Sequence, residues 1–96
     1  MTNTKGLFPI ESGGKVGFVD EDGKIVVDYI YDKTYPFSVG LALVRANGWW
    51  GYIDKTGKEV IPFLYDDARY FNKDGKAKVK LNGEVFYIDT KGNRVE

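Results

Sequence analysis

The acidic stretch Asp20-Glu21-Asp22-Gly23 comes closest, in residue types, to a metal site. Alternating carboxylates followed by a glycine open an EF-hand calcium loop, which also needs a bidentate glutamate at its twelfth position. Counted from Asp20, the twelfth residue is Tyr31. Two similar Asp-x-x-Gly stretches carry Lys55 and Lys91, whose charge opposes cation binding. We therefore predict a hairpin turn here, and we expect no metal site and no cofactor.

The adjacent pair Asp66 and Asp67 is the second candidate for chemistry. Glycoside hydrolysis needs two carboxyl groups that face one another across a cleft, whereas neighbouring side chains of an extended segment point in opposite directions. The chain has no histidine and no cysteine, so a common general base and a common nucleophile are missing. We expect a protein that is not an enzyme, with small-molecule hydrolysis as a third alternative. Asp66 and Asp32 are predicted to cap the backbone locally.

Lys76, Lys78 and Lys80 form a basic row on one face of a predicted strand. Such a row could bind phosphate groups, but lysines on an edge strand commonly serve to prevent pairing with other sheets. We favour that structural role. The 14 basic and 14 acidic side chains cancel, so we expect no nucleic-acid partner, which would usually require a net positive charge.

An internal repeat in the sequence predicts which strands and turns position these residues. The same spacing of glycine, aspartate and aromatic residues recurs after 34 positions, and part of it, Gly48, Asp54 and Gly57, recurs after a further 35 as Gly83, Asp89 and Gly92. The first set is Gly17, Asp20, Gly23, Tyr31 and Phe37, matched by Gly51, Asp54, Gly57, Tyr65 and Phe71. A repeat of this length predicts a tandem array of similar units.

Each unit is predicted to contain three strands followed by an aromatic tail that crosses to the next unit. In the middle unit the strands are residues 41–46, 49–54 and 59–61, and Pro62 ends the last one. Asn47-Gly48 predicts a type I′ hairpin turn, because both residues tolerate positive φ. The fold class is therefore all-β: tandem antiparallel three-stranded β-meanders of about 34 residues. Two units are complete and the third is incomplete, with boundaries at 6–39, 40–74 and 75–96.

The first strands alternate between two faces. One face is small or apolar in every unit and is predicted to point inward; it consists of Phe8, Ile10, Ser12, Ala42, Val44, Ala46, Ala77, Val79 and Leu81. The other face carries Leu41, Leu43 and Arg45 in the middle unit and the three lysines in the last. This change predicts that the middle unit is covered by a neighbour and that the third unit is a cap.

Trp49 has the strongest case for binding. The equivalent positions hold Lys15 and Glu84, which are expected to be solvated, so an exposed indole here could stack on a sugar, a base or a partner side chain. The alternative is that Trp49 packs on a neighbouring strand or on the Leu41 and Leu43 face. Trp50 aligns with apolar residues and is predicted to be core, and Gly51 is predicted to allow a ring or a backbone to approach closely.

The stretch from Gly40 through Trp50-Gly51 to Pro62, continuing to Phe71, resembles the WG-containing repeat, also called the KWG repeat, of many bacterial proteins. The resemblance extends over residues 6–96. Only the middle unit keeps both Trp and Gly, since the outer units have Val16-Gly17 and Val85-Phe86. The resemblance implies β-repeat modules used in arrays for interaction, and it brings no catalytic residues.

We therefore predict a non-catalytic interaction module that binds a protein or a carbohydrate through an aromatic surface formed by Trp49, Leu41, Leu43 and Arg45. The alternative is a structural role in which the incomplete third unit pairs with another copy, giving a homo-oligomer. No apolar run is long enough for insertion into a membrane. The first five residues lack the apolar core of a signal peptide, and a longer parent protein is an open alternative, so the compartment is not determined.

Overall fold

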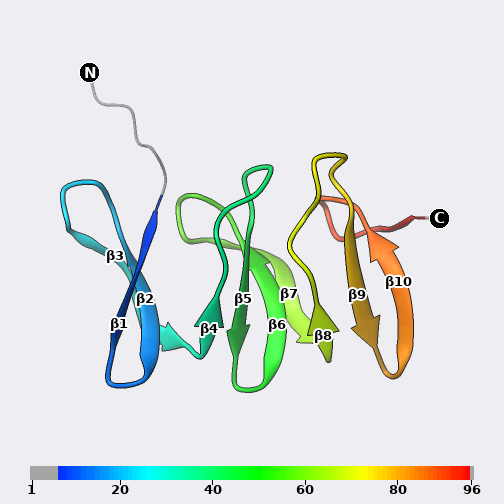
Figure 1. The fold of residues 1–96 in the computed structure, drawn as a ribbon, viewed down its shortest axis with the longest axis horizontal. Coiled ribbons are helices and arrows are strands. Elements are labelled where there is room, and N and C mark those ends of the chain that lie inside the picture. Colours follow the sequence, from blue (N-terminus) through cyan, green and yellow to red (C-terminus); the bar gives the residue numbers. More distant parts are fainter. Residues whose placement is uncertain (1–6, 96) are drawn as a thin grey trace.

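The computed structural model describes residues 7–95, which form three antiparallel sheets arranged side by side along the longest axis of the molecule (Figure 1). The outer limits predicted for the first and third units, residues 6 and 96, and the first five residues lie outside this range. The strands are β1 (Phe8–Ser12), β2 (Lys15–Val19), β3 (Ile25–Tyr31), β4 (Lys33–Thr34), β5 (Ala42–Ala46), β6 (Trp49–Ile53), β7 (Glu59–Tyr65), β8 (Asp67–Ala68), β9 (Ala77–Leu81), β10 (Glu84–Ile88) and β11 (Arg94–Val95).

The all-β repeat fold predicted from the sequence is confirmed, but the second and third sheets have four strands rather than the predicted three, because the preceding unit supplies one. β7 runs through Pro62 to Tyr65, so the predicted end of this strand is wrong. The first sheet has the order β1-β2-β3, the second β4-β5-β6-β7 and the third β11-β10-β9-β8. The short strands β4 and β8 follow β3 and β7 along the chain, yet they pair with the next sheet. We call residues 32–34 and 66–68 the crossover segments. The described residues contain no helix that could cross a membrane.

The hairpin turns have the predicted type I′ geometry. Asn47 and Gly48 have φ values of 54° and 86°, and the turn between β1 and β2 has 59° at Gly13 and 83° at Gly14. Asn82 repeats the pattern in the third sheet, with a φ of 52°. Because asparagine and glycine reach positive φ at little cost, these residues set the register of each first hairpin.

The Asp-x-x-Gly stretches form turns in which the carboxylate accepts backbone amides. Asp54 Oδ1 accepts the amides of Thr56 at 2.8 Å and Lys58 at 3.1 Å. Asp20 and Asp89 make the same two bonds, and Asn72 makes them with its amide oxygen. The hairpin turn predicted for residues 20–24 is thus present, and no group of three potential metal ligands occurs among residues 7–95.

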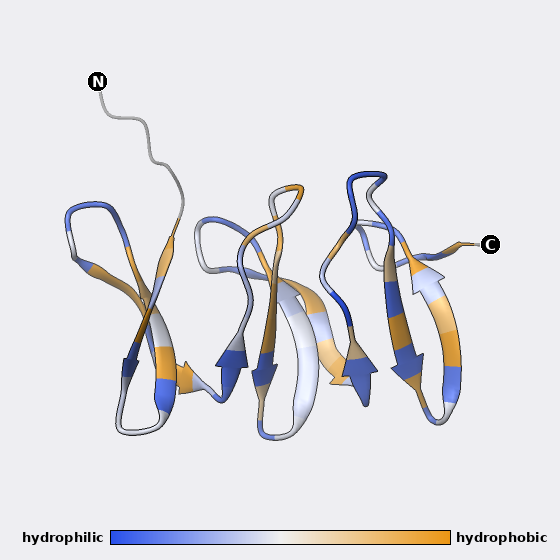
Figure 2. Cartoon of the chain, in the orientation of Figure 1, coloured by the Kyte–Doolittle hydropathy of each residue, from blue (hydrophilic) through white to orange (hydrophobic). Residues whose placement is uncertain are grey.

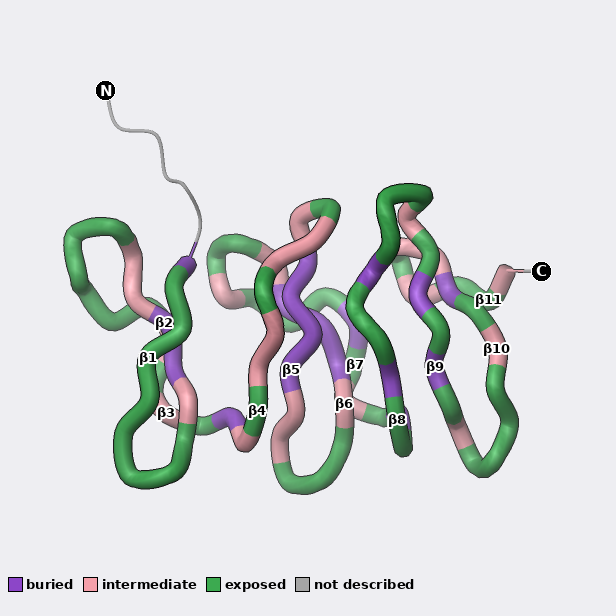
Figure 3. Tube along the Cα trace, viewed as in Figure 1, coloured by how far each residue is buried: buried purple, intermediate pink, exposed green. Residues whose placement is uncertain are grey.

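The core consists of two apolar clusters, one on each face of the second sheet. Ala42, Val44 and Ile53 pack towards the first sheet, and Leu41, Leu43 and Tyr52 belong to the cluster shared with the third sheet. Both faces of β5 are therefore buried, whereas β1 is exposed along its length (Figure 3). The prediction that the middle unit is covered by a neighbour is correct.

Glycine permits the close approach of β7 to β6 and of β3 to β2. A β-carbon at Gly51 would lie 2.9 Å from the carbonyl oxygen of Ile61 and 2.9 Å from the Phe63 ring. At Gly17 it would lie 2.5 Å from the carbonyl oxygen of Val27. The register shifts at both places, which is typical of a β-bulge. The predicted role of Gly51 is confirmed.

Candidate interaction surfaces

The structure separates the four residues predicted to form the aromatic binding surface. Leu41 and Leu43 are only 6% and 2% exposed, because the third sheet packs over them, so their assignment to a binding surface is wrong. The Arg45 guanidinium lies over the Trp50 ring, 5.7 Å from its centroid. Trp49 is 46% exposed and is the only one of these four residues that is exposed, since Arg45 is half-buried.

Trp49 differs from its equivalents in the other sheets. Lys15 donates to Asp32, and Glu84 pairs with Arg94 at 2.7 Å, so both charged residues are engaged at the surface. Trp49 begins β6 beside the hairpin turn, opposite Ala46. Its neighbour Trp50 is turned the other way and packs on the core cluster, as predicted.

The crossover aspartates are bonded to residues far along the chain and do not cap their own segment. Asp66 Oδ2 accepts the amide of Asn82 at 2.8 Å, from a residue sixteen positions away. Asp32 accepts a hydrogen bond from the Lys15 ammonium and lies near the backbone amides of Gly48 and Asn47. The Lys15 ammonium is the main cause of the lowered pKa of Asp32, and the two amides add to it. The local cap predicted for these residues is wrong.

Backbone hydrogen bonds hold each crossover segment against the first strand of the following unit. The two segments make the same bonds at equivalent positions, each from an amide of the segment, or of the residue that follows it, to a carbonyl of the strand. The bonds are Asp32 to Arg45 at 2.7 Å, Tyr35 to Leu43 at 2.9 Å, Asp66 to Lys80 at 2.8 Å and Arg69 to Lys78 at 2.9 Å. The interface between units is therefore a repeated structure.

The glycines of the second and third Asp-x-x-Gly turns, Gly57 and Gly92, lie against the preceding unit. A β-carbon at Gly57 would meet the Val27 side chain at 2.5 Å, and one at Gly92 would meet Ile61 at 3.5 Å. The equivalent Gly23 has no heavy atom of the described chain within 4 Å of that position. Within residues 7–95 the first sheet thus lacks the neighbour that the other two sheets have.

The outer side of the first sheet, which we call the open face, contradicts the predicted inward face for this unit. Phe8 is 46% and Ile10 39% exposed, whereas Ala42 and Val44 are fully buried. Their third-sheet equivalents Ala77 and Val79 are buried as well. Among residues 7–95 no strand pairs with the outer edge of β1, because no crossover segment in that range precedes it.

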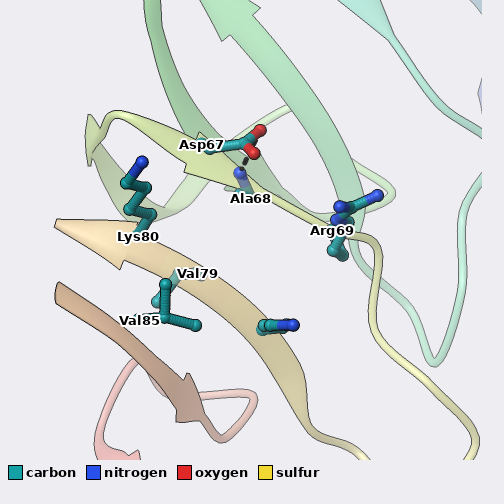
Figure 4. Close-up of a pocket in the computed structure, with 7 residues that line it drawn as sticks. Asp67, Ala68, Arg69, Val79, Lys80 and Val85 are labelled. Atoms are coloured by element: carbon teal, nitrogen blue, oxygen red, sulfur yellow. Dashed lines mark hydrogen bonds between the residues drawn. The ribbon is translucent and has the colours of Figure 1, made fainter. Parts of the chain in front are cut away.

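The outer side of the third sheet is basic. Lysines alternate with buried apolar residues along β9, seen as blue and orange bands in Figure 2. β9 pairs with both β8 and β10, so the prediction that these lysines lie on an edge strand is wrong. A cavity of about 210 Å³ lies on this sheet (Figure 4); its lining includes Arg69, Lys78, Lys80, Asp67 and Val85.

The repeated geometry is matched by a family model. The model of the WG containing repeat covers residues 17–48 and 50–84, more than half of the chain. The chain belongs to the WG-containing repeat family. The comparison with curated proteins gave no match, and neither did the comparison with solved structures. In this WG repeat chain Trp50 packs on Tyr35, 5.9 Å between ring centroids, and Gly51 admits β7, so the Trp-Gly pair is architectural.

Sequence reasoning missed the open face, although a signal for it was present. Phe8 and Ile10 are larger than Ala42 and Val44, the residues at the same positions of the middle unit. Alternation places all four on the same side of their strands, but it does not say which side has a neighbour. The size difference marks the first unit as the one with space in front of it.

Proposed function

We propose that this WG repeat chain is a non-catalytic interaction module that binds a protein partner through the open face of its first sheet. The observation that carries the proposal is the contrast between Phe8 and Ile10, which are 46% and 39% exposed, and their buried equivalents Ala42 and Val44. The equivalent surfaces of the second and third sheets are each covered by the preceding sheet.

The open face combines the two features that sheet-binding partners use. Burying a large apolar side chain fully contributes roughly 1.5–3 kcal/mol. Phe8 and Ile10 are only partly buried in the chain, so a partner that covers them would gain part of this free energy. The outer edge of β1 also offers backbone groups to an added strand, as in β-augmentation. A protein segment can supply both contacts together, whereas a small polar ligand cannot.

The opposite end of the chain is less suited to an apolar partner. An apolar surface placed over Lys76, Lys78 and Lys80 would have to remove water from three ammonium groups, which is costly without paired anions. The lysine side chains are exposed in the folded chain. They weigh against the assembly alternative, in which the third unit pairs with another copy.

A peptide selection tests this function. Random peptides selected on the immobilised chain are expected to protect the β1 amides from hydrogen exchange. Ile10→Glu should abolish their binding, because it places a charge on the open face at a position that is already 39% exposed. Val85→Glu, at a 50% exposed position of the third sheet, is the matched control and should leave binding unchanged. Binders that map elsewhere would contradict the proposal.

A second candidate function is carbohydrate binding at Trp49, favoured by an exposed indole where the sister units hold ion-paired side chains. A sugar ring stacked on Trp49 should shift the tryptophan emission of the chain. Trp49→Ala should remove the shift, and a glycan array would supply the ligands. An array without a hit that depends on Trp49 would dismiss this candidate.

A further inference from the structure

We propose that the open face binds an extended segment carrying an aspartate two residues ahead of an alanine or threonine, and that the Gly13-Gly14 turn binds the aspartate carboxylate. This rests on the proposed function and names its ligand by chemistry. The two crossover segments inside the chain, Asp32-Lys33-Thr34 and Asp66-Asp67-Ala68, are the pattern for that ligand.

The carboxylate contact follows from the turns. Asp66 accepts the amide of Asn82, in the first hairpin turn of the next unit, at 2.8 Å. Asp32 lies near the equivalent Asn47-Gly48 turn, whose amides contribute to the lowered pKa of the Asp32 carboxyl. Gly13 and Gly14 have φ values of 59° and 83°, close to the 54° and 86° of Asn47 and Gly48. The same backbone geometry turns the amides in the same direction. No carboxylate of residues 7–95 is hydrogen-bonded to this turn.

The edge of β1 keeps the acceptors that the segment needs. The internal segments donate to the carbonyl oxygens of Arg45 and Leu43, whose equivalents in β1 are Glu11 and Pro9. Proline lacks an amide hydrogen but retains its carbonyl oxygen. Pro9 therefore limits pairing by strands that need a donor there, while it allows the pairing made by the crossover segments.

The internal segments also indicate which side chains the ligand needs on either side of its aspartate. Ala68 lies opposite Val79 and is 6% exposed, so a small residue is needed two positions after the aspartate. Ile61 and Val27 stand five positions before their aspartates and meet Gly92 and Gly57. Gly23 leaves that place open in the first sheet. A matching ligand carries an aliphatic residue at this position.

A second copy stacked by its third sheet fits the open face poorly. Its lysines would lie against the apolar side chains of Phe8 and Ile10, which carry no charge to pair with an ammonium group. Other classes of partner do not offer an aspartate and a strand amide with this spacing. The occupant is therefore a crossover-like segment of a partner protein.

Amide NMR of the isotope-labelled chain with a synthetic peptide of residues 59–70 tests the assignment. The peptide carries Ile61, Asp66 and Ala68. We expect shifts confined to residues 8–14 and Gly23, with the Gly13 and Gly14 amides moving downfield. The Asp66→Asn peptide should bind about tenfold more weakly, since a charge-assisted hydrogen bond is lost. The Asp67→Asn peptide is the matched control and should bind about as well as the parent.

The outcomes separate this inference from the proposed function. Equal binding by the Asp66→Asn peptide would overturn the carboxylate contact and leave the open face as a docking site. If selected peptides bind β1 but the 59–70 peptide does not, the ligand pattern is wrong. Shifts at residues 77–81 would mean that the peptide replaces the chain's own crossover segment, which also overturns the assignment. Loss of all peptide binding to β1 would reject both.

Discussion

The outer faces of the first and third sheets are built on the same strand pattern but present opposite surfaces. The first exposes Phe8 and Ile10, and the third exposes Lys78 and Lys80. In the second sheet each of the corresponding faces is covered by a neighbour. The comparison shows that a few side chains on the first strand of a unit decide whether its outer face is apolar or charged.

The comparison also shows that the two ends of the repeat array differ. A solenoid needs polar ends to stay soluble, and here the lysines provide one at the third sheet only. The first sheet keeps apolar side chains, an unpaired edge within the described residues and an open glycine turn. Docking on the chain is therefore expected at one end.

The largest effect is expected from placing a charge at equivalent positions of a covered and an open face. Val44→Asp buries an unpaired carboxylate at a fully buried site and should cost about 4 kcal/mol or more. Ile10→Asp should cost less than about 1 kcal/mol, because its side chain keeps contact with water. Urea unfolding measures both. Equal losses would mean that the open face is covered in the folded chain.

A smaller loss is expected where glycine admits a neighbouring strand. Gly51→Ala should destabilise the fold by about 2 kcal/mol through overpacking against Ile61 and Phe63. Gly17→Ala should cost more, since its nearest contact is a backbone oxygen at 2.5 Å. Thermal unfolding measures the change. If Gly51→Ala left the stability unchanged, β7 would be free to move away from β6. The covered second sheet would then be packed no more tightly than the open first sheet.

The contact between units made by Asp66 should be worth about 1 kcal/mol. Asp66→Ala removes the acceptor of the Asn82 amide and should lower the free energy of unfolding by that amount. Asp22→Ala is the control, because its exposed carboxylate accepts no hydrogen bond from residues 7–95. Similar losses of stability for the two variants would contradict a role of the crossover aspartates in the contact between units.

The smallest expected effect is the acid dependence contributed by the Asp-x-x-Gly turns. The Thr56 hydroxyl is the main cause that lowers the pKa of Asp54, and the amides of Thr56 and Lys58 add to it. The unfolded chain then binds more protons at low pH, so stability falls as the pH drops below the ordinary aspartate pKa of about 3.9. Asp54→Asn should flatten the decline in urea titrations. An unchanged slope would contradict this.

The sequence predicted the features that depend on local backbone chemistry. Asn47-Gly48 identified a type I′ turn because few residues adopt its φ values, and Gly51 identified a close approach because only glycine leaves the space. The repeat period then extended both predictions along the chain. These features need no knowledge of which sheet lies beside which.

The errors concern contacts between sheets. Leu41 and Leu43 were assigned to a surface because alternation defines two faces without naming the neighbour of each. β8 has only two residues, too short for a recognisable pattern, so β9 was taken for an edge strand. The bond from Asp66 to Asn82 spans sixteen positions, and no local signal reveals it.

The position of β4 and β8 affects how the chain could be divided. Each sheet after the first is closed by a strand that the preceding sheet supplies. A fragment cut at residue 40 would begin a sheet without that strand, whereas one spanning residues 32–65 would hold all four strands of the second sheet. Unfolding of one unit would also remove the edge strand that it supplies to the next sheet. Neighbouring sheets are therefore expected to unfold together rather than one at a time.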